Sequence, residues 1–183
     1  TIEKDGKTSL IETEKILVSV GRKANLLQVG LDKLNIELLR NGVKVDEHMQ
    51  TSHPCVYACG DITGHSMLAH TAIRESEVAI NHILEVEDRM NYDCVPGVVY
   101  TNPEVAGVGK TEEELKASGI SYHVQKLPMA YSGRFVAENE QGNGLCKLIL
   151  DDDDRIIGCH MLGNPASELI VLAGIAVQHG YTV

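Results

Sequence analysis

Several residue types are scarce in this chain, and each scarcity excludes a class of protein. Tryptophan is absent and phenylalanine occurs once, so the hydrophobic core must be aliphatic. Basic residues number 16 against 26 acidic ones, which leaves a formal net charge of -10. Nucleic acids and anionic membranes bind basic surfaces, so neither is expected as a partner. No apolar run approaches the roughly 20 residues that cross a bilayer. The first residues, TIEKDGKTSL, are polar and do not resemble a signal peptide, so we expect a cytoplasmic protein.

Cysteine and histidine also lack the patterns that mark disulfide or metal proteins. The odd number of cysteines, five, and their irregular spacing exclude a secreted disulfide framework. Cys55 and Cys59 fall in a predicted strand, where residues four apart lie roughly 13 Å from each other. A disulfide needs Cα atoms within about 7 Å, so we expect buried free thiols. The eight histidines, among them His65 and His70, are dispersed and form no zinc pattern, so no metal site is predicted.

What the chain does contain is, first, a segment of mixed strands and helices over residues 1–95. An Asp5-Gly6 turn predicts a hairpin within residues 1–20. The dense apolar run 16–20 predicts a strand buried on both faces. A short strand is expected at 51–59, and the apolar spacing over 66–84 predicts an amphipathic helix.

The texture changes at residues 88–97, where we place a domain boundary. Strands dominate the remainder, with the sequences GVVYT, VAGVG, SYHVQKL, GLCKLIL and RIIGCHML. Short turns between several of them predict an antiparallel sheet with helices on one side, an α+β layer.

Two helices are expected in this second part. The first begins with a capping box, Thr111 and Glu114, and ends at Gly119. The second begins at Asn164-Pro165 and ends at Gly180. Its middle, LIVLAGIAV, is apolar nearly all round, so it must either lie deep in the domain or meet a partner subunit.

Two motifs in the second part invite functional interpretations that their context does not support. GVGKT at 107–111 resembles the end of a phosphate-binding loop, but that loop requires Gly at 104, where this chain has Glu104. A dinucleotide fingerprint fails as well, because position 112 is also Glu, so we expect a structural strand, turn and helix. The acidic run Asp151–Asp154 lies between two apolar strands and is interpreted as a hairpin turn rather than a calcium site.

The segment VYACGDITG, residues 56–64, is the strongest functional candidate. It places one carboxylate, Asp61, between an expected strand and an expected helix. Asp61 could cap that helix, or it could accept hydrogen bonds from the hydroxyls of a sugar or polyol. The amides near Met67–His70 would present partial positive charge to an anionic or electron-rich atom. Both interpretations stay open on the residues alone.

Residues Thr51–Asp61, TSHPCVYACGD, resemble the second flavin-binding motif of the pyridine nucleotide–disulfide oxidoreductases. The resemblance implies that Asp61 binds the ribityl chain of FAD and that Gly60 permits the close approach. Met67, Leu68, Ala69 and His70 look like the family's segment whose backbone faces the flavin pyrimidine edge, where a helix dipole stabilises negative charge.

Two further stretches extend the resemblance along the chain. VSVGRKAN resembles the signature that closes the family's NAD-binding domain, with Gly21 near NAD and Ala24 where the family usually has Pro. The run from Tyr92 to Lys116 is similar to the interface domain of the dihydrolipoyl dehydrogenase group. The resemblance therefore implies the end of an NAD-binding domain (1–22), an FAD-domain and central segment (23–95), and a C-terminally truncated dimerisation domain (96–183). The expected fold is an α/β fragment followed by an α+β domain with an antiparallel sheet.

The implied function belongs to a longer protein of which this chain is expected to be a C-terminal portion. That enzyme would reoxidise dihydrolipoamide and pass electrons through a cysteine pair and FAD to NAD⁺. The resemblance also implies a homodimer formed through residues after about 97. The substrate would be a lipoyl domain of a 2-oxo acid dehydrogenase or glycine cleavage complex. The redox Cys-x4-Cys pair, both glycine-rich loops and the acid–base His are not found here, so we expect no catalytic residue in this chain and no activity. The alternatives are another flavin disulfide reductase, of the mercuric or glutathione type, and a non-catalytic dimerisation module.

Overall fold

The computed structural model describes residues 1–27, 29–139 and 142–183. These residues divide into two compact units, Thr1–Ser76 and Glu77–Val183. Among the described residues, no helix has both the length and the apolar character that a membrane span requires. The regular elements in chain order are β1 (Ile2–Lys4), β2 (Lys7–Ser9), η1 (Leu31–Leu34), η2 (Gly60–Thr63), α1 (Ala69–Ile83), η3 (Tyr92–Cys94), β3 (Gly97–Val99), β4 (Val105–Gly109), α2 (Glu112–Ser118), β5 (His123–Pro128), η4 (Met129–Tyr131), α3 (Gly133–Glu138), β6 (Leu145–Leu150), β7 (Ile156–Leu162) and α4 (Ala166–His179), the η elements being 3-10 helices.

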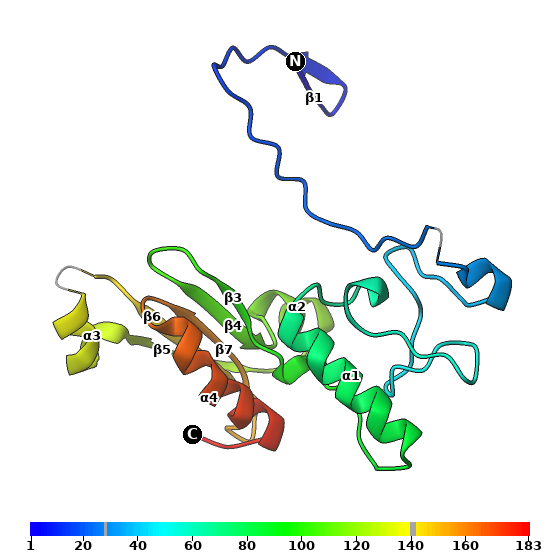
Figure 1. The fold of residues 1–183 in the computed structure, drawn as a ribbon. Helices are drawn as coiled ribbons and strands as arrows, with labels where there is room; N and C mark the ends of the chain where they lie inside the picture. The colour runs from blue at the N-terminus through cyan, green and yellow to red at the C-terminus, as the bar shows by residue number, and fades with distance from the viewer. Residues whose placement is uncertain (28, 140–141) are drawn as a thin grey trace. The chain divides into compact units, whose positions relative to one another are not determined.

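The first unit begins with the expected hairpin, drawn in dark blue in Figure 1. β1 and β2 pair antiparallel, and the turn residues Asp5 and Gly6 both have positive φ, as a tight hairpin turn requires. The strand expected at 16–20 is wrong, because the described residues contain no strand that pairs with it. Ile16 is 81 % and Leu17 is 91 % exposed. An isolated extended segment leaves its backbone groups to water, so its apolar pattern has nothing to pack on.

The strand expected at 51–59 is also absent, and only one bridge, Gln50 to Tyr57, remains. The chain instead folds back on itself, since the Thr51 amide donates to the Val56 carbonyl at 2.9 Å. Pro54 lies inside this loop and has no amide to give to a strand ladder. The helix expected at 66–84 is confirmed as α1.

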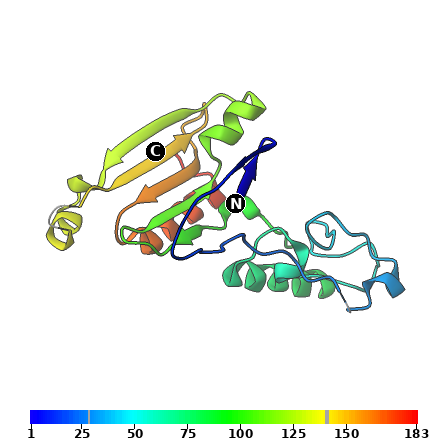
Figure 2. The same cartoon turned by 90° about the horizontal axis from the view of Figure 1, so that it is seen from above.

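The second unit contains the predicted antiparallel sheet, with strand order β3-β4-β7-β6-β5. Figure 2 shows its strands side by side, and all four pairings in it are antiparallel. The turn between β6 and β7 is the acidic run Asp151–Asp154, so the hairpin interpretation is confirmed. The strand, turn and helix expected around GVGKT are confirmed as β4 and α2.

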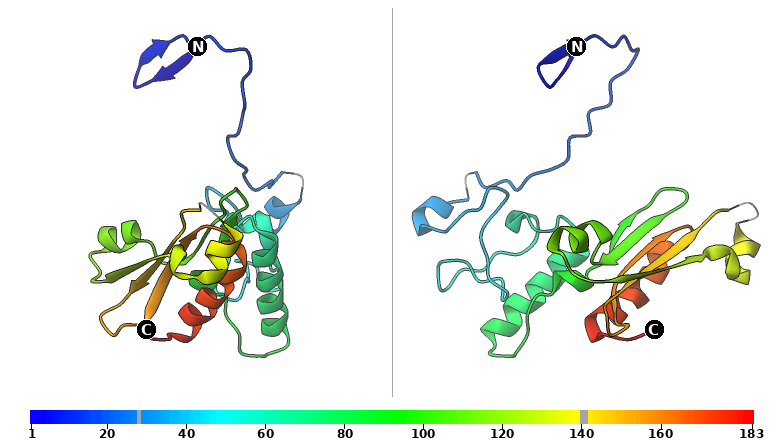
Figure 3. Two further views of the ribbon diagram at one scale, coloured as in Figure 1. Left: turned by 90° about the vertical axis from the view of Figure 1, so that its left-hand side faces the viewer. Right: turned by 180° about the vertical axis from the view of Figure 1, so that it is seen from behind.

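α4 covers one face of this sheet, as the views in Figure 3 show. The core beneath it combines small and branched residues from the helix with alternate residues of β4 and β7. Its buried members are Ala106, Val108, Cys159, Ala166, Ile170 and Ala173. Alternation along each strand therefore points one set of side chains at α4 and the other set away from it.

The opposite face is partly covered as well, so the expectation of helices on one side only is wrong. Lys147 and His160 lie on that face, opposite each other across β6 and β7. Lys147 donates to Glu112 of α2 at 3.0 Å, and Ile149 on the same face is fully buried.

The helix ends follow the sequence signals with one exception. The capping box of Thr111 and Glu114 is present, and Gly119 and Gly180 end their helices in the left-handed region. Asn164 does not cap α4, because its side-chain oxygen accepts the Glu104 amide at 2.8 Å instead. α4 is half exposed rather than enclosed, and Leu172 on its outer side is 67 % exposed.

Candidate functional site

The candidate site lies in the first unit, where the chain turns at Gly60 and Asp61 into η2. Gly60 is buried and has φ +80, a conformation that L side chains rarely adopt. A Cβ at this position would lie 3.2 Å from the Cβ of Ala72 on α1. Glycine therefore allows both the turn and its close approach to the helix.

A buried carboxylate fixes this turn from the helix side. Glu75, on α1, is fully buried, and its Oε2 accepts a short hydrogen bond from the Gly60 amide. Buried carboxylates are rare unless they are hydrogen-bonded, because desolvating the charge is costly. Glu75 therefore ties the beginning of η2 to the second turn of α1.

A close crossing of two backbone segments, at Gly42 and Gly64, also holds this turn in place. Thr63 is buried and donates its hydroxyl to the Gly60 carbonyl at 3.0 Å. A Cβ at Gly64 would lie 2.3 Å from the Asn41 carbonyl oxygen, and one at Gly42 would lie 2.3 Å from the Thr63 carbonyl group. The two chain segments can cross only because both residues lack a side chain.

Asp61 is held at the surface of this rigid turn. Its side chain is 53 % exposed, and the Arg22 guanidinium lies 3.9 Å from its carboxylate. Arg22 is itself 81 % exposed, so this ion pair contributes little to stability. Asp61 does not cap α1, because that helix begins at Ala69, eight residues further along the chain. The capping interpretation is therefore wrong. The carboxylate is thus presented to solvent without a structural role in the helix.

The segment Met67–His70 leads directly into α1. The first bond of the helix runs from the Ala72 amide to the Leu68 carbonyl at 3.0 Å. The amides of Ala69, His70 and Thr71 therefore form the positive end of the helix. Met67 is half-buried, whereas Leu68, Ala69 and His70 are exposed.

The structure brings the predicted residues into one region of the first unit. Gly60, Asp61 and the segment 67–70 are joined through η2 and α1, and Gly21 precedes the Arg22 that reaches Asp61. Gly21 has φ +80, and a Cβ at this position would have no neighbouring atom within 4 Å. Glycine at 21 is therefore favoured by the positive φ of the backbone and not by close packing.

Glu75, Thr63 and Gly42 are the site residues that sequence reasoning missed. Glu75 carried a usable signal, since it interrupts the apolar stripe Leu68, Ala72, Ala79 at helical spacing. A carboxylate on the buried side of a helix indicates a specific partner. Thr63 and Gly42 gave no comparable signal, because their role depends on a crossing of two segments that are distant in the sequence.

Cys59, at the end of the predicted strand 51–59, does not have the properties of a redox nucleophile. Burial raises the pKa of the Cys59 thiol, Glu75 acts in the same direction, and a hydrogen bond with Ser76 opposes them. Cys59 therefore stays protonated at neutral pH. Cys55 is exposed, which corrects the expectation that it is buried, and all five cysteines are free thiols.

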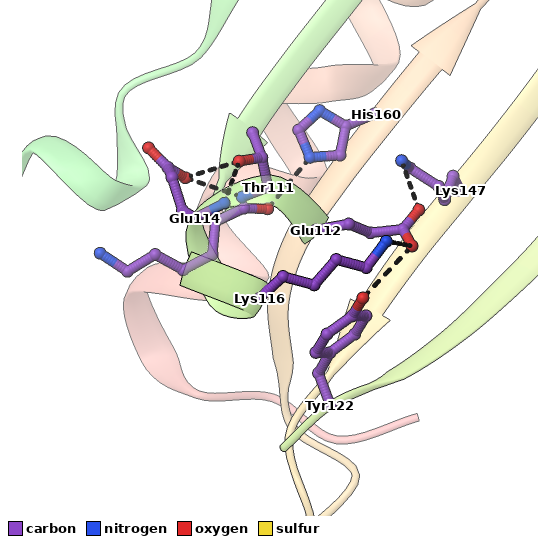
Figure 4. Close-up of polar contacts among 8 residues, drawn as sticks. Thr111, Glu112, Glu114, Lys116, Tyr122, Lys147 and His160 are labelled. Atoms are coloured by element: carbon purple, nitrogen blue, oxygen red, sulfur yellow. Dashed lines mark hydrogen bonds and ion pairs between the residues drawn. The ribbon is translucent and has the colours of Figure 1, made fainter. Parts of the chain in front are cut away.

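A second polar cluster lies in the other unit, where α2 meets the sheet (Figure 4). Glu112 binds Lys147, and Lys116 and the Tyr122 hydroxyl approach it at 3.7 and 3.4 Å. The hydrogen bond from Lys147 lowers the pKa of Glu112, and the bonds from the Thr111 backbone and side chain lower the pKa of Glu114. Each charge is satisfied within the cluster, so we interpret it as a structural link between α2 and β6. Among the described residues, no group of His, Cys, Asp and Glu is arranged to hold a metal ion.

Comparison with known proteins identifies the family. The model of the pyridine nucleotide-disulphide oxidoreductases matches residues 1–76, and the model of their dimerisation domain matches residues 95–183. The chain belongs to the pyridine nucleotide-disulphide oxidoreductases. This confirms the resemblance and the fold inferred from the sequence, with the five-stranded antiparallel sheet in the dimerisation domain.

Several members of this family are similar along nearly the whole chain. The mitochondrial dihydrolipoyl dehydrogenase of Caenorhabditis elegans is 40 % identical over 179 residues, which are 97 % of this chain and 36 % of the relative. The mitochondrial enzyme of Bos taurus is 38 % identical over 96 % of this chain and 35 % of its own length. The chain thus spans about a third of the curated relatives it matches.

Solved structures of the family agree with this fold. LpdA from Mycobacterium tuberculosis superposes with a TM-score of 0.80 at 29 % identity, covering 87 % of this chain and 35 % of that one. The HOCl-induced flavoprotein disulfide reductase RclA from Escherichia coli gives a TM-score of 0.74 at 24 % identity, over 90 % of this chain and 38 % of its own. The latter likeness concerns the fold alone.

Proposed function

We propose that this chain is part of a flavin-dependent dihydrolipoyl dehydrogenase and that it supplies one side of the FAD site. The family membership and the identities near 40 % to dihydrolipoyl dehydrogenases support this activity over a mercuric or glutathione reductase. The single observation that carries the cofactor role is the solvent-facing carboxylate of Asp61 on a turn that Gly60 and Glu75 hold rigid.

The residues present fit the ribityl and ring portions of FAD. Asp61 offers two acceptor oxygens to polyol hydroxyls, and Gly60 adds no side chain that would obstruct the approach. The positive end of α1, at Met67–His70, stabilises electron density that lies close to it. Bound FAD supplies the redox chemistry, the transfer of an electron pair from a dithiol to NAD⁺. Gly21 would lie near NAD in the same arrangement.

The proposal extends to partners and to location. The exposed side chains of α4, in the part that matches the dimerisation domain, would form part of a homodimer contact through residues after about 97. Dihydrolipoamide would be presented by a lipoyl domain of a 2-oxo acid dehydrogenase or glycine cleavage complex. A cytoplasmic location stays a prediction. Because no redox cysteine pair or acid–base His is assigned in this chain, catalysis would require residues from the rest of the parent enzyme.

The test is Asp61→Asn in the parent enzyme that this proposal implies. Hydrogen bonds to a charged acceptor contribute about 1.5–3 kcal/mol, so FAD affinity should fall roughly 10- to 150-fold. Asp32→Asn is the matched control, since Asp32 is an exposed acid of η1 in the same unit. FAD retention after gel filtration and the Kd from flavin fluorescence measure the effect. Unchanged FAD affinity in Asp61→Asn would contradict the proposed role.

A second measurement separates the proposal from a non-catalytic module. The isolated 183-residue chain should show no NADH–lipoamide turnover, whereas the parent enzyme should show it. A parent protein that is a stable dimer but binds no FAD and lacks turnover would favour the module.

A further inference from the structure

The second unit contains two cysteines that the proposed function does not use. Cys146 lies on β6 opposite Met161, and Cys159 lies on β7 opposite Leu148. The two cysteines are therefore diagonal neighbours on the same face of the sheet, the face that α4 covers. The two thiols lie close enough for each to shift the pKa of the other.

Cys146 opens onto an apolar cavity, whereas Cys159 does not. The cavity has a volume of about 360 Å³. Leu127, Met129, Phe135, Met161 and Leu169 line it together with Cys146, so its walls are mainly hydrocarbon and thioether. Cys159 is fully buried in the core beneath α4. The Cys146 thiol thus faces a space large enough for a small molecule, and the Cys159 thiol lies next to it in the core.

The pairing divides two roles between the cysteines. The hydrogen bond from Cys159 lowers the pKa of Cys146 to about 7 against the opposing effect of burial. The same bond, together with burial, raises the pKa of Cys159. Cys146 is thus the more acidic thiol of the pair, and Cys159 is the partner that retains its proton.

We propose that Cys146 is a covalent modification site for small apolar electrophiles of the α,β-unsaturated carbonyl class. The cavity is the binding pocket, and Cys159 is the positioning donor. The Cys146 sulfur bonds to the β-carbon of the electrophile, and the π pair of the C=C bond moves onto the carbonyl oxygen. The resulting enolate takes a proton from water. No bond to a leaving group breaks and no oxidant is required.

The experiment measures modification rates on the purified 183-residue chain with two electrophiles, trans-2-octenal and acrylamide. Adducts are quantified by peptide mapping with mass spectrometry, after borohydride reduction of the octenal adducts. Cys55, an exposed thiol of the other unit, is the internal control. The ratio of the Cys146 rate to the Cys55 rate should be at least about tenfold larger for octenal than for acrylamide, because burial of two methylene groups of the tail suffices for that gain.

Two variants test the donor. Cys159→Ala removes it and should move the pH midpoint of the Cys146 rate from about 7 towards about 8.5, the ordinary thiol range. At pH 7 the rate should fall only about threefold, since the more basic thiolate is the better nucleophile. Cys159→Ser keeps a hydroxyl donor and should leave the midpoint much nearer to 7.

Either of two results overturns the proposal. The first is an equal Cys146-to-Cys55 ratio for both electrophiles, which needs no variant and so does not depend on how the variants fold. The second is the same pH midpoint in folded Cys159→Ala as in the parent chain.

Discussion

The backbone crossing beneath the Gly60–Asp61 turn yields the sharpest prediction, because a matched control exists in the same unit. Gly64 and Gly30 have nearly the same φ, +70 and +75. A Cβ at Gly64 would lie 2.3 Å from a backbone oxygen, that of Asn41, whereas a Cβ at Gly30 would have no atom within 4 Å. Alanine at either position incurs the left-handed strain of about 1–2 kcal/mol, partly offset by the stiffer unfolded chain. Only Gly64→Ala must also push two backbone segments apart.

Overpacking of this kind costs about 1–3 kcal/mol, so Gly64→Ala should destabilise the turn by about 2 kcal/mol more than Gly30→Ala. That difference corresponds to roughly a 30-fold faster amide exchange. Hydrogen exchange with mass spectrometry, read on peptides that cover residues 60–76, measures it. Tryptophan fluorescence cannot serve, since the chain has none. If the two variants exchange equally fast over these residues, the crossing does not hold the turn, and the rigid presentation of Asp61 loses its support.

Three further predictions concern the second unit. Thr111→Ala removes the cap of α2 and should lower the free energy of unfolding by about 1 kcal/mol, measured by urea denaturation followed by circular dichroism. Ile170→Ala, at a fully buried position of α4, should lower it by about 2–5 kcal/mol in the same assay. The pKa of Glu112 is lowered in the folded state, so its contribution to stability is present above the ordinary carboxyl range and is lost as the pH falls through the folded pKa. Lys147→Met should therefore raise that pKa, measured by NMR titration, and flatten the acid limb of the stability profile; an unchanged Glu112 titration would show that Lys147 is not the cause.

The second half of the fold could be predicted from the sequence because its signals are local. Each of its sheet strands is a short apolar run bounded by turn residues, and three of the four pairings join strands that are consecutive in the chain, whereas the fourth joins β4 to β7. The capping box at Thr111 and the glycine at 119 each act within a single turn of helix. Both helix ends predicted from these residues are therefore found in the structure. The cap assigned to Asn164 failed for the opposite reason. Its side chain accepts a hydrogen bond from the backbone amide of Glu104, 60 residues away, and no local sequence pattern predicts that contact.

The candidate site divides along the same line. Gly60 and Asp61 could be found because they form a contiguous motif that resembles the family's flavin-binding segment. Thr63 and Gly42 could not, since they matter only where two distant segments cross. The run 16–20 shows the limit of hydrophobic pattern itself. The pattern predicts which residues prefer burial, but a strand also requires a neighbour for its backbone, and the described residues supply none.

Glu75 indicates how such a site can be found when a motif is incomplete. A carboxylate within the apolar stripe of a helix conflicts with burial unless a donor awaits it, and the donors available at a tight turn are backbone amides. In this structure the amide of Gly60, one residue before Asp61, donates to Glu75. The charge that looks misplaced on α1 is therefore explained by the turn it holds. The same turn needs glycine at 60 for its positive φ and for the approach of Ala72. Gly60, Gly64 and Glu75 are each unusual for a regular helix or strand, and all three hold the turn that carries the Asp61 carboxylate. This shared support distinguishes Asp61 from the other exposed acids of the first unit.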